Sequence, residues 1–503
     1  MTGKVWLVGA GPSDPGLFTR KGEQVLKSAE VVVYDALVGQ GVLSMIPKEA
    51  KTINVGKRSG NHTMCQEEIN RTLVREAKEG RRVVRLKGGD PFLFGRGGEE
   101  LELLVRENIP YEVVPGVTSA LSVPAYNGIP VTHRDFCSSL HIITGHKRRG
   151  GVYDIDFEAL VRTKGTLVFL MGAAALDDIC QGLLKGGMDP ETPAAVLQKG
   201  TTAAQKKIVA SLGTLSEKAR RQGMETPAII VVGQVCNLAE QFEWYEKLPL
   251  AGMKIAVTRP RELISRMSER LREQGAEVLE FPAICIEKRV CEGEVKENLT
   301  RLEKFDWLVF TSPSGVRIFF EDLRECRLDV RCLAGKKIAV LGQGTAKALE
   351  EWGVYADLMP GEAYAESLGK ALRESLQGGE RVLIFRASAG SSELTEQLAQ
   401  VPRIKVVDLA AYDTRYESSP LIDIVAEFED GRTDYAVFTS ASTVKGFAGA
   451  AGEMDFSKVK AVCIGKKTKA EADRLGMKTF MAEHPSIESV TEKLIELAKG
   501  RRK

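Results

Sequence analysis

The stretch Arg85-Leu-Lys-Gly-Gly-Asp-Pro-Phe-Leu-Phe-Gly-Arg-Gly-Gly-Glu99 begins inside the short apolar run Val83–Leu86 and continues as a loop rich in glycine. An apolar run of this length is typical of a buried β-strand, and glycines directly after it let the backbone approach a ligand closely. Outward from this stretch, strand-sized apolar runs recur at Val5–Val8 and Val31–Tyr34. Amphipathic segments such as Gln66–Glu79 separate such runs. This alternation predicts an α/β fold.

The composition indicates a globular chain with no dedicated role in nucleic-acid binding. The 503 residues suffice for several domains of ordinary size, and 43% of them are hydrophobic while 27% are charged. The formal net charge is only +2, from 70 basic and 68 acidic residues. A dedicated nucleic-acid binder is usually far more basic, so no nucleic-acid partner is expected. A local basic cluster can still hold a small anionic substrate.

The cysteines and histidines form no recognisable metal-binding or disulfide pattern. The nine cysteines are scattered singly without CxxC spacing, and the five histidines are dispersed. We therefore expect reduced thiols, no bound metal and a cytoplasmic location. The first apolar run, Val5–Val8, has only the length of a strand. It predicts neither a signal peptide nor a membrane span, so no membrane partner is expected.

The chain changes pattern near Pro249. Strand-like and helix-like segments alternate up to residue 248, and a proline and a glycine then precede a new strand-like run, Met253–Thr258. Such punctuation is typical of a domain junction. We predict a first module over residues 1–248 and a second over residues 253–503.

The second module repeats itself. Three pairs of strand-like segments match in order and at nearly one offset: Lys254–Arg259 with Arg381–Arg386, Asp306–Ser312 with Asp434–Ser440, and Ile338–Gly342 with Ala461–Gly465. The period is too long for a solenoid. It predicts two similar α/β domains, about 253–379 and 380–503 in sequence, with a ligand cleft between them.

The first glycine-rich turn raises a nicotinamide oxidoreductase as one alternative. The turn Gly9–Gly16 follows the first strand, and Asp35 ends the next one. A carboxylate at that place binds a ribose hydroxyl in dinucleotide-binding folds. The glycines do not follow GxGxxG spacing, however, and Pro12 and Pro15 lie where a helix should offer free N–H groups. The spacing therefore favours a different ligand.

Several motifs, in order, resemble the tetrapyrrole methyltransferase family. They are Arg85–Glu99, Val114–Ala120 and Gly128–Arg134, together with Tyr34–Val38 and Val55–Arg58, which look like those of uroporphyrinogen-III C-methyltransferase. The similarity covers about residues 3–245. It implies a two-domain tetrapyrrole methylase fold, S-adenosyl-L-methionine as methyl donor, and two C-methylations of uroporphyrinogen III to precorrin-2. It also implies a homodimer formed through this module.

The same resemblance assigns cofactor-binding residues motif by motif. They are Pro12, Gly88, Gly89, Asp90, Leu93, Thr118, Ser119, Met171, Gly200 and Ala228. The chemistry agrees, because Asp90 can accept from hydroxyl or ammonium groups and the glycines permit close backbone approach. Outside the motif, Met171 would be interpreted as a core residue.

Methyl transfer to carbon requires the loss of a proton. Asp35, at the carboxyl end of its strand, is the expected base, and Lys57 is its expected partner, as proton donor or as a cation for a substrate carboxylate. The alternatives are a helix N-cap for Asp35 and a solvated charge for Lys57. Further basic side chains are candidates for binding the substrate's carboxylates: Arg58, His133, Arg134, His146, Lys147, Arg148 and Arg149.

A second series of short motifs resembles uroporphyrinogen-III synthase over nearly the whole second module. The motifs are Val257–Pro260, Phe281–Ile284, Val309–Pro313, Gly342, Arg386, Ala411–Thr414, Val437–Ser442 and Ile464–Gly465. The resemblance implies closure of hydroxymethylbilane to uroporphyrinogen III. It also implies two flavodoxin-like α/β domains joined by a two-strand linker, which Phe281–Glu287 and Val407–Thr414 would form.

The second module's motifs contain few acid or base groups, so we expect it to act mainly by holding the substrate's geometry. The candidate substrate-binding residues are Thr311, Ser312, Arg386, Tyr412, Thr439, Ser440 and Ser442. The serines and threonines have plain helix N-capping as an alternative. Arg259 and Arg386 are interpreted either as substrate cations or as interdomain salt bridges, and Tyr412 as an aid to departure of the hydroxyl.

Together the modules predict a bifunctional tetrapyrrole enzyme whose second half supplies the substrate of the first. Besides the nicotinamide oxidoreductase, the alternative is a methyltransferase fused to a noncatalytic tetrapyrrole-binding module. Sirohaem, cobalamin and other tetrapyrroles all remain open as end products.

Overall fold

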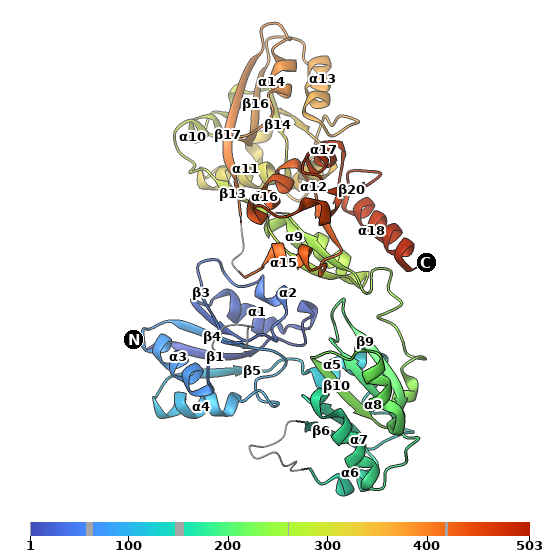
Figure 1. Ribbon diagram of the computed structural model, residues 1–503. Coiled ribbons are helices and arrows are strands. Elements are labelled where there is room, and N and C mark those ends of the chain that lie inside the picture. Colours follow the sequence, from blue (N-terminus) through green and yellow to red (C-terminus); the bar gives the residue numbers. More distant parts are fainter. Residues whose placement is uncertain (1, 57–63, 146–154, 260, 418–420, 503) are drawn as a thin grey trace.

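The computed structural model describes residues 2–56, 64–145, 155–259, 261–417 and 421–502. The N-terminal half forms a first lobe (residues 2–114) and a second lobe (residues 119–245). The C-terminal half forms two α/β domains above them in Figure 1. We call the domain next to the lobes (residues 253–281 and 421–502) the proximal domain. The other one (residues 284–416) is the distal domain.

The first lobe is built on a parallel sheet with the strand order β3-β2-β4-β1-β5. Its strands are β1 (Lys4–Gly9), β2 (Val31–Tyr34), β3 (Lys51–Asn54), β4 (Arg82–Lys87) and β5 (Tyr111–Val114). The central strands are buried on both faces, which explains their continuous apolar runs. Helices α1 (Arg20–Lys27) and α2 (Gln40–Leu43) follow β1 and β2, and α3 (Gln66–Lys78) and α4 (Gly97–Arg106) flank β4 in sequence.

The second lobe carries a mixed sheet with the order β6-β7-β10-β8-β9. Its strands are β6 (Leu140–Thr144), β7 (Thr166–Leu170), β8 (Pro193–Gln198), β9 (Lys206–Ser211) and β10 (Ala228–Val232). Strands β6 and β7 are parallel, and the other pairs are antiparallel. Helices α5 (Ser119–Tyr126), α6 (Phe157–Thr163), α7 (Leu176–Lys185) and α8 (Leu212–Arg221) accompany the sheet. The predicted two-domain α/β arrangement of this half is confirmed.

The proximal domain has a parallel sheet with the order β12-β11-β18-β19-β20. Its strands are β11 (Lys254–Val257), β12 (Glu277–Glu280), β18 (Tyr435–Phe438), β19 (Lys460–Cys463) and β20 (Lys478–Met481). Numbered in the order of the fold, these strands run 2-1-3-4-5, which is the flavodoxin-like order. The helices are α9 (Arg261–Glu273), α15 (Ile424–Glu429), α16 (Ala441–Ala451), α17 (Lys466–Arg474) and α18 (Ile487–Arg502).

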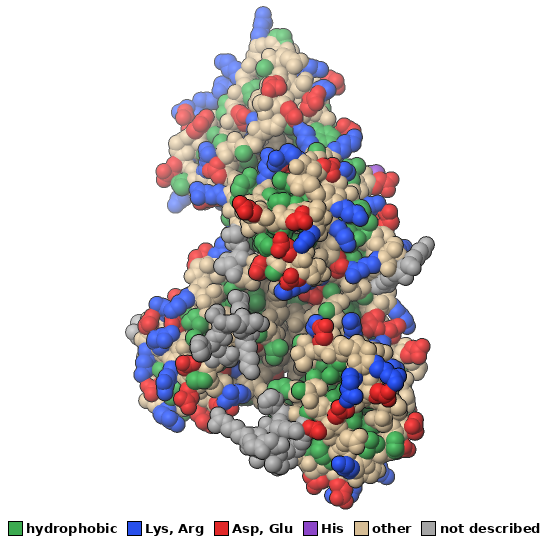
Figure 2. Space-filling model, in the orientation of Figure 1, with side chains coloured by type: hydrophobic (Ala, Val, Ile, Leu, Met, Phe, Trp, Pro, Cys, Tyr) green, Lys and Arg blue, Asp and Glu red, His purple; other side chains and the backbone are tan. Residues whose placement is uncertain are grey.

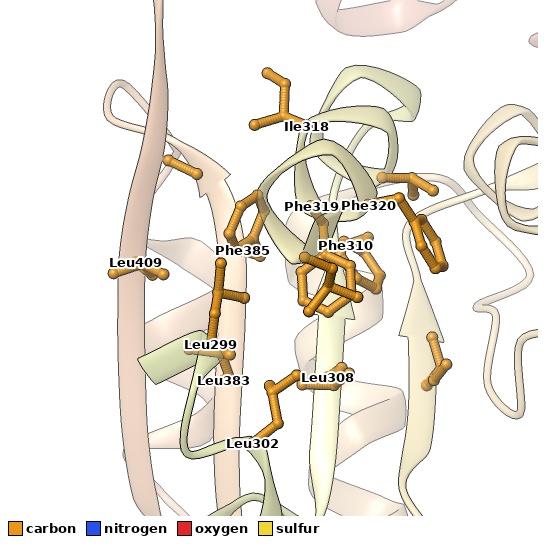
Figure 3. Packing of buried hydrophobic residues seen from close by; sticks show 14 of the residues in the cluster. Leu299, Leu302, Leu308, Phe310, Ile318, Phe319, Phe320, Leu383, Phe385 and Leu409 are labelled. Carbon is orange, nitrogen blue, oxygen red and sulfur yellow. The ribbon is translucent and has the colours of Figure 1, made fainter. Parts of the chain in front are cut away.

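The distal domain has a sheet with the order β13-β17-β16-β14-β15. Its strands are β13 (Ile284–Lys288), β14 (Trp307–Phe310), β15 (Lys337–Val340), β16 (Arg381–Ala387) and β17 (Lys405–Tyr416). The helices are α10 (Gly293–Leu299), α11 (Pro313–Glu325), α12 (Gln343–Glu350), α13 (Ala365–Ser375) and α14 (Glu393–Leu398). In its core, Phe319 packs edge-to-face against Phe310 and Phe385, with ring centroids 5.1 and 5.3 Å apart (Figure 3).

The two sheets of the C-terminal half each combine strands from both sequence repeats. By the repeat, β11 matches β16, β14 matches β18 and β15 matches β19. The proximal sheet contains β11, β18 and β19, whereas the distal sheet contains β16, β14 and β15. Equivalent strands therefore occupy equivalent places, but the segments 253–379 and 380–503 do not correspond to the two sheets.

The chain achieves this exchange because it passes between the domains twice. Strand β13 leads from the proximal to the distal domain, and the end of β17 leads back. The two segments pair antiparallel, from Ile284 opposite Tyr416 to Lys288 opposite Tyr412. The predicted two-strand linker is confirmed in this pair. Among the described residues, no helix is both long and apolar enough to cross a bilayer.

Candidate functional site

Three loops meet at the carboxyl edge of the first lobe's sheet. Gly11 and Gly89 exchange backbone hydrogen bonds of 3.2 and 2.8 Å, which join the loops after β1 and β4. A Cβ on Gly9 would lie 2.5 Å from the Cα of Gly116, in the loop after β5. A Cβ on Gly88 would lie 2.6 Å from that of Leu37. The glycines are therefore needed for this close packing, whatever ligand the edge binds.

Asp90 fastens two of these loops together. Its Oδ1 accepts from the backbone N–H groups of Phe92 and Leu93 at 2.8 and 3.1 Å, and its Oδ2 accepts from Gly116 N at 3.0 Å. The carboxylate thus positions Leu93 and Gly116 within the protein. A carboxylate offers about four acceptor sites, so this role leaves room for the predicted contact with a ligand.

Asp35 lies directly after β2, with about a quarter of its side chain exposed. Its Oδ1 accepts from Leu37 N at 3.1 Å, and Arg85 Nη1 donates to its Oδ2 at 3.4 Å. The next helix begins at Gln40, and its N-cap is Gly39. The helix N-cap interpretation of Asp35 is therefore wrong. The carboxylate stands at the sheet edge with an arginine behind it.

A buried cluster of charged residues contacts Asp35 through Arg85. Glu100 is fully buried at the start of α4, and its Oε1 accepts from Arg85 Nε at 3.0 Å and from Lys87 Nζ at 2.8 Å. Both cations are also buried on β4. Burial, together with the charge of Arg85, lowers the pKa of Lys87.

Arg85 connects this cluster to the surface, because it contacts both Glu100 and Asp35. Sequence reasoning missed the cluster. The available signal was the presence of two cations, Arg85 and Lys87, inside an otherwise apolar strand. Buried charges are rarely kept without a paired partner or a role in a site.

The other basic candidates are only partly described. Lys57 lies outside the described residues, as do Arg58 and the run from His146 to Arg149. His133 is half-buried; its Nδ1 accepts from Asp135 N at 3.2 Å, and its ring packs against Phe136. Arg134 is exposed.

The second lobe brings further candidates toward the first. Thr201 Oγ1 donates to the carbonyl oxygen of Pro12 at 2.7 Å, which ties the two lobes together. The neighbouring Gly200 is packed so closely that a Cβ would lie 2.4 Å from Val123 Cγ1 on α5. Thr118 caps α5 by accepting from Ala120 N at 3.2 Å. The surface is hollowed between the two lobes (Figure 2).

Met171 and Ala228 lie at strand ends of the second lobe. Met171 follows β7 with a φ of 55°, and half of it is exposed. The alternative interpretation of Met171 as a core residue is therefore wrong. Ala228 begins β10 and is buried, as expected for a residue at which only backbone or a methyl group can face a ligand.

The hydroxyl groups of the C-terminal half lie at two equivalent strand ends. Ser312 follows β14 and caps α11 by accepting from Gly315 N at 3.0 Å. Ser440 follows β18 and caps α16 by accepting from Thr443 N at 3.2 Å. Their neighbours Thr311 and Thr439 are half-buried at the same sheet edges. The N-capping alternative is correct for the two serines.

Two of these hydroxyls have further hydroxyl partners. Ser440 Oγ lies 2.8 Å from Ser442 Oγ, and Ser312 Oγ lies 2.6 Å from the hydroxyl of Tyr412. Tyr412 belongs to the linker strand β17 and is 3% exposed. Burial raises the pKa of Tyr412, so its hydroxyl stays protonated at neutral pH. The hydrogen bond between Ser312 and Tyr412 therefore joins the N-terminus of α11 to the linker strand β17.

The repeat-equivalent arginines differ in their surroundings. Arg386 is buried and forms a bidentate pair with Asp408 on the adjacent strand, with an Nε–Oδ1 distance of 2.8 Å. This pair lies inside the distal domain, so the interdomain alternative is wrong for Arg386. Because its guanidinium is already engaged, the geometry favours a structural role over a contact with substrate.

Arg259 follows β11 at the equivalent place of the proximal domain. The acid in register with Asp408 is Glu280, but its carboxylate accepts from Arg272 at 2.7 Å instead. The Nε of Arg259 is buried and no described residue accepts from it. Burial and the charge of Arg266 lower the pKa of Arg259. Arg259 is therefore the better candidate for an anion contact.

One further polar cluster holds a lysine between two carboxylates. Cys291 comes close to Asp322 and Glu325 of α11, and the thiols of Cys291 and Cys326 are 3.6 Å apart. The ammonium group of Lys288 lies 2.7 Å from Asp322 and also contacts Glu325. The cation of this cluster is thus a lysine of the chain itself.

The four sheets and their loop-lined edges define a class: an α/β protein built from two halves, each with two sheets. Residues 4–216 match the family Tetrapyrrole (Corrin/Porphyrin) Methylases, and residues 265–492 match Uroporphyrinogen-III synthase HemD. The chain is 44% identical to the "Porphyrin biosynthesis protein HemD" of Ruminiclostridium josui, over 99% of each chain. It belongs to this family of fused tetrapyrrole biosynthesis proteins.

Other relatives match part of the chain. The "Uroporphyrinogen-III C-methyltransferase" of Bacillus subtilis is 41% identical over 68% of this chain and 70% of its own length. A solved structure, that of uroporphyrin-III C-methyl transferase from Thermus thermophilus complexed with S-adenyl homocysteine, is 41% identical. It covers 47% of this chain and 99% of its own, with a TM-score of 0.41.

Proposed function

We propose that the chain catalyses two consecutive steps of tetrapyrrole synthesis. The C-terminal half closes hydroxymethylbilane to uroporphyrinogen III, and the N-terminal half methylates that product twice to precorrin-2. The observation that carries the methyltransferase assignment is Asp35 at a sheet edge, backed by the buried Arg85–Glu100 pair. Family membership over the full length supports the combination.

In the N-terminal half, the bound S-adenosyl-L-methionine would supply an electrophilic methyl group. The residues to hold it are Gly88 and Gly89 in the loop after β4, Pro12, which is hydrogen-bonded to Thr201, and the exposed Met171. Asp35 is proposed to take the proton that the macrocycle must lose when a ring carbon is methylated, since it is a partly exposed carboxylate held by Arg85. Lys57 keeps its proposed role as the partner of this base.

In the C-terminal half, the proposed role of the protein is to hold the substrate in the geometry required for ring closure. The hydroxyls at the ends of β14 and β18 offer hydrogen bonds to acetate and propionate groups, and Arg259 offers a cation at the same edge as Thr439. Tyr412, protonated and fixed by Ser312, is proposed to assist departure of the hydroxyl. The substrate's own pyrrole nitrogens drive that departure, so the protein chiefly excludes unwanted closure.

We further propose a cytoplasmic homodimer formed through the N-terminal half. Several large apolar side chains of that half are exposed, among them Phe92, Phe94, Leu121 and Phe136. Exposed apolar groups of this size are typical of an interaction surface when they form one patch. Light scattering during gel filtration should give twice the mass of the chain, and a monomeric mass would refute the dimer.

The test of the proposed function is incubation with hydroxymethylbilane, with and without S-adenosyl-L-methionine. We expect the type III macrocycle without the methyl donor and its dimethylated product with it. Failure to accelerate or direct ring closure would instead favour the noncatalytic tetrapyrrole-binding module. A change in nicotinamide absorbance without methylation would favour the oxidoreductase.

A further inference from the structure

The C-terminal half touches the N-terminal half through the proximal domain, and it does so at both lobes. On the first lobe, the amide of Gln40 accepts from Lys254 Nζ at 3.1 Å and donates to Glu427 at 3.1 Å. On the second lobe, Ala203 N donates to Glu277 Oε2 at 2.8 Å. A small cavity of about 90 Å³ lies between these contacts.

These contacts form one connected polar group. Lys254 is 12% exposed and pairs with the buried Glu427 at 2.9 Å, while Glu277 lies 3.5 Å from the same ammonium group. Lys254 is therefore shared between the contact to Gln40 on one lobe and the contact to Ala203 on the other. Because its members are largely buried, removal of one leaves its neighbours with fewer partners and little water to replace it.

Glu277 reaches the cofactor candidates through a short chain of hydrogen bonds. It holds Ala203, in the turn that follows Gly200. In the same turn, Thr201 Oγ1 holds the carbonyl of Pro12 at 2.7 Å. Gly200 and Pro12 come from opposite lobes, and both are proposed to contact S-adenosyl-L-methionine. The turn therefore links the proximal domain to both lobes at the proposed S-adenosyl-L-methionine site.

We propose that Glu277 is a positioning residue for methyl-donor binding, through which the proximal domain braces the two lobes of the methyltransferase half. The inference rests on the proposed function of that half. Glu277 contacts no ligand itself; it fixes the 200–203 turn, and Thr201 passes the constraint to Pro12. The brace should make docking of the proximal domain and donor binding mutually dependent, as any coupling between two sites is reciprocal.

The test compares full-length variants by titration calorimetry with S-adenosylhomocysteine and by initial rates. Glu277→Ala should weaken binding about three- to tenfold, the range expected for one lost hydrogen bond. The KM for the donor should rise by the same factor at unchanged kcat, and ring closure should be unaffected. Glu277→Gln retains an acceptor for Ala203 N and should restore most of the affinity. Glu496→Ala, which removes an exposed ion pair elsewhere in the same domain, is the matched control.

A double-mutant cycle tests the route. Thr201→Val removes the donor to Pro12, so Glu277→Ala should add little to its effect if the two act in series. Equal affinities for Glu277→Ala and Glu496→Ala, or fully additive effects with Thr201→Val, would overturn the brace. If the unaltered chain binds no S-adenosylhomocysteine, the proposed methyltransferase function fails, and this inference fails with it.

Discussion

The two halves of the chain use the same kind of sheet edge in opposite ways. In the N-terminal half, Arg85, Lys87 and Glu100 form a buried charged cluster next to a partly exposed carboxylate, Asp35. In the C-terminal half, the ends of β14 and β18 carry hydroxyl groups that cap helices, those of Ser312 and Ser440. The difference agrees with the two proposed reactions, because removal of a proton requires a base held in position, whereas ring closure requires the substrate to be held in one geometry.

The strongest way to break this comparison is Asp35→Ala. Removal of the proposed base should lower the methylation rate by about 10²- to 10⁴-fold, the range for loss of a general base. Ring closure by the same preparation should remain unchanged, because Asp35 lies in the other half. Separate assays of the two products give both rates, and Asp189→Ala, at an exposed turn, is the control. Loss of both activities would contradict the division of labour.

The buried charge itself is tested by Glu100→Ala. This change leaves Arg85 and Lys87 buried without their common carboxylate, which should destabilise the first lobe by about 3–5 kcal/mol. Glu100→Gln keeps one acceptor and should cost less. Glu99→Ala, at an exposed neighbour on the same helix, should be nearly neutral. Denaturant unfolding measures the stability of each variant. Equal stability of the Glu100→Ala and Glu99→Ala variants would refute the predicted cost of removing the buried carboxylate.

The two repeat-equivalent arginines sharpen the comparison within the C-terminal half. Arg259→Met should raise the KM for hydroxymethylbilane about ten- to 150-fold, since a charge-assisted contact contributes about 1.5–3 kcal/mol. Arg386→Met should instead lower thermal stability and leave the KM of the folded protein unchanged, because Arg386 is engaged by Asp408. Steady-state kinetics and calorimetry on both variants separate the roles. The reverse outcome would exchange the two assignments.

The smallest effect is expected for Tyr412→Phe. The ring remains packed in the linker and only the hydrogen bond to Ser312 is lost, so stability should fall by about 0.5–1.5 kcal/mol. If Tyr412 also assists departure of the hydroxyl, the kcat of ring closure should fall several-fold beyond the control, Tyr355→Phe, whose side chain is exposed. An unchanged kcat would restrict Tyr412 to the linker.

Much of the fold could be predicted, because local apolar runs report on buried strands. The runs at Val5–Val8 and Val31–Tyr34 are strands, and the repeat correctly indicated two sheets with equivalent strands. The repeat could not show which strands share a sheet, since pairing is a long-range property. β11 pairs with β18, which lies far along the chain, and the equivalent strands β16 and β14 pair in the distal sheet. Each of these pairs joins a strand of one repeat to a strand of the other.

Site residues could be predicted from the sequence where they belong to a motif. Residues whose role depends only on their packing partners could not. Asp35, Gly88 and Gly89 were found from sequence order, and the structure places them at one sheet edge. The role of Glu100 was hidden, because a glutamate at a helix start is ordinarily a solvated residue. The unpaired Nε of Arg259, for which no described residue is an acceptor, was hidden for a similar reason: it depends on the pairing of Glu280 with Arg272.

The exchange of strands between the C-terminal sheets also sets an order of assembly on the ribosome. Strands β11 and β12 are synthesised before the whole distal domain, and β18–β20 after it. The lobes and the continuous distal domain can therefore fold while the proximal sheet is still missing its last three strands. The proximal domain, which joins the two catalytic halves, is completed last. A nascent chain arrested after residue 417 should hold both lobes folded but lack the complete proximal domain that joins the two halves.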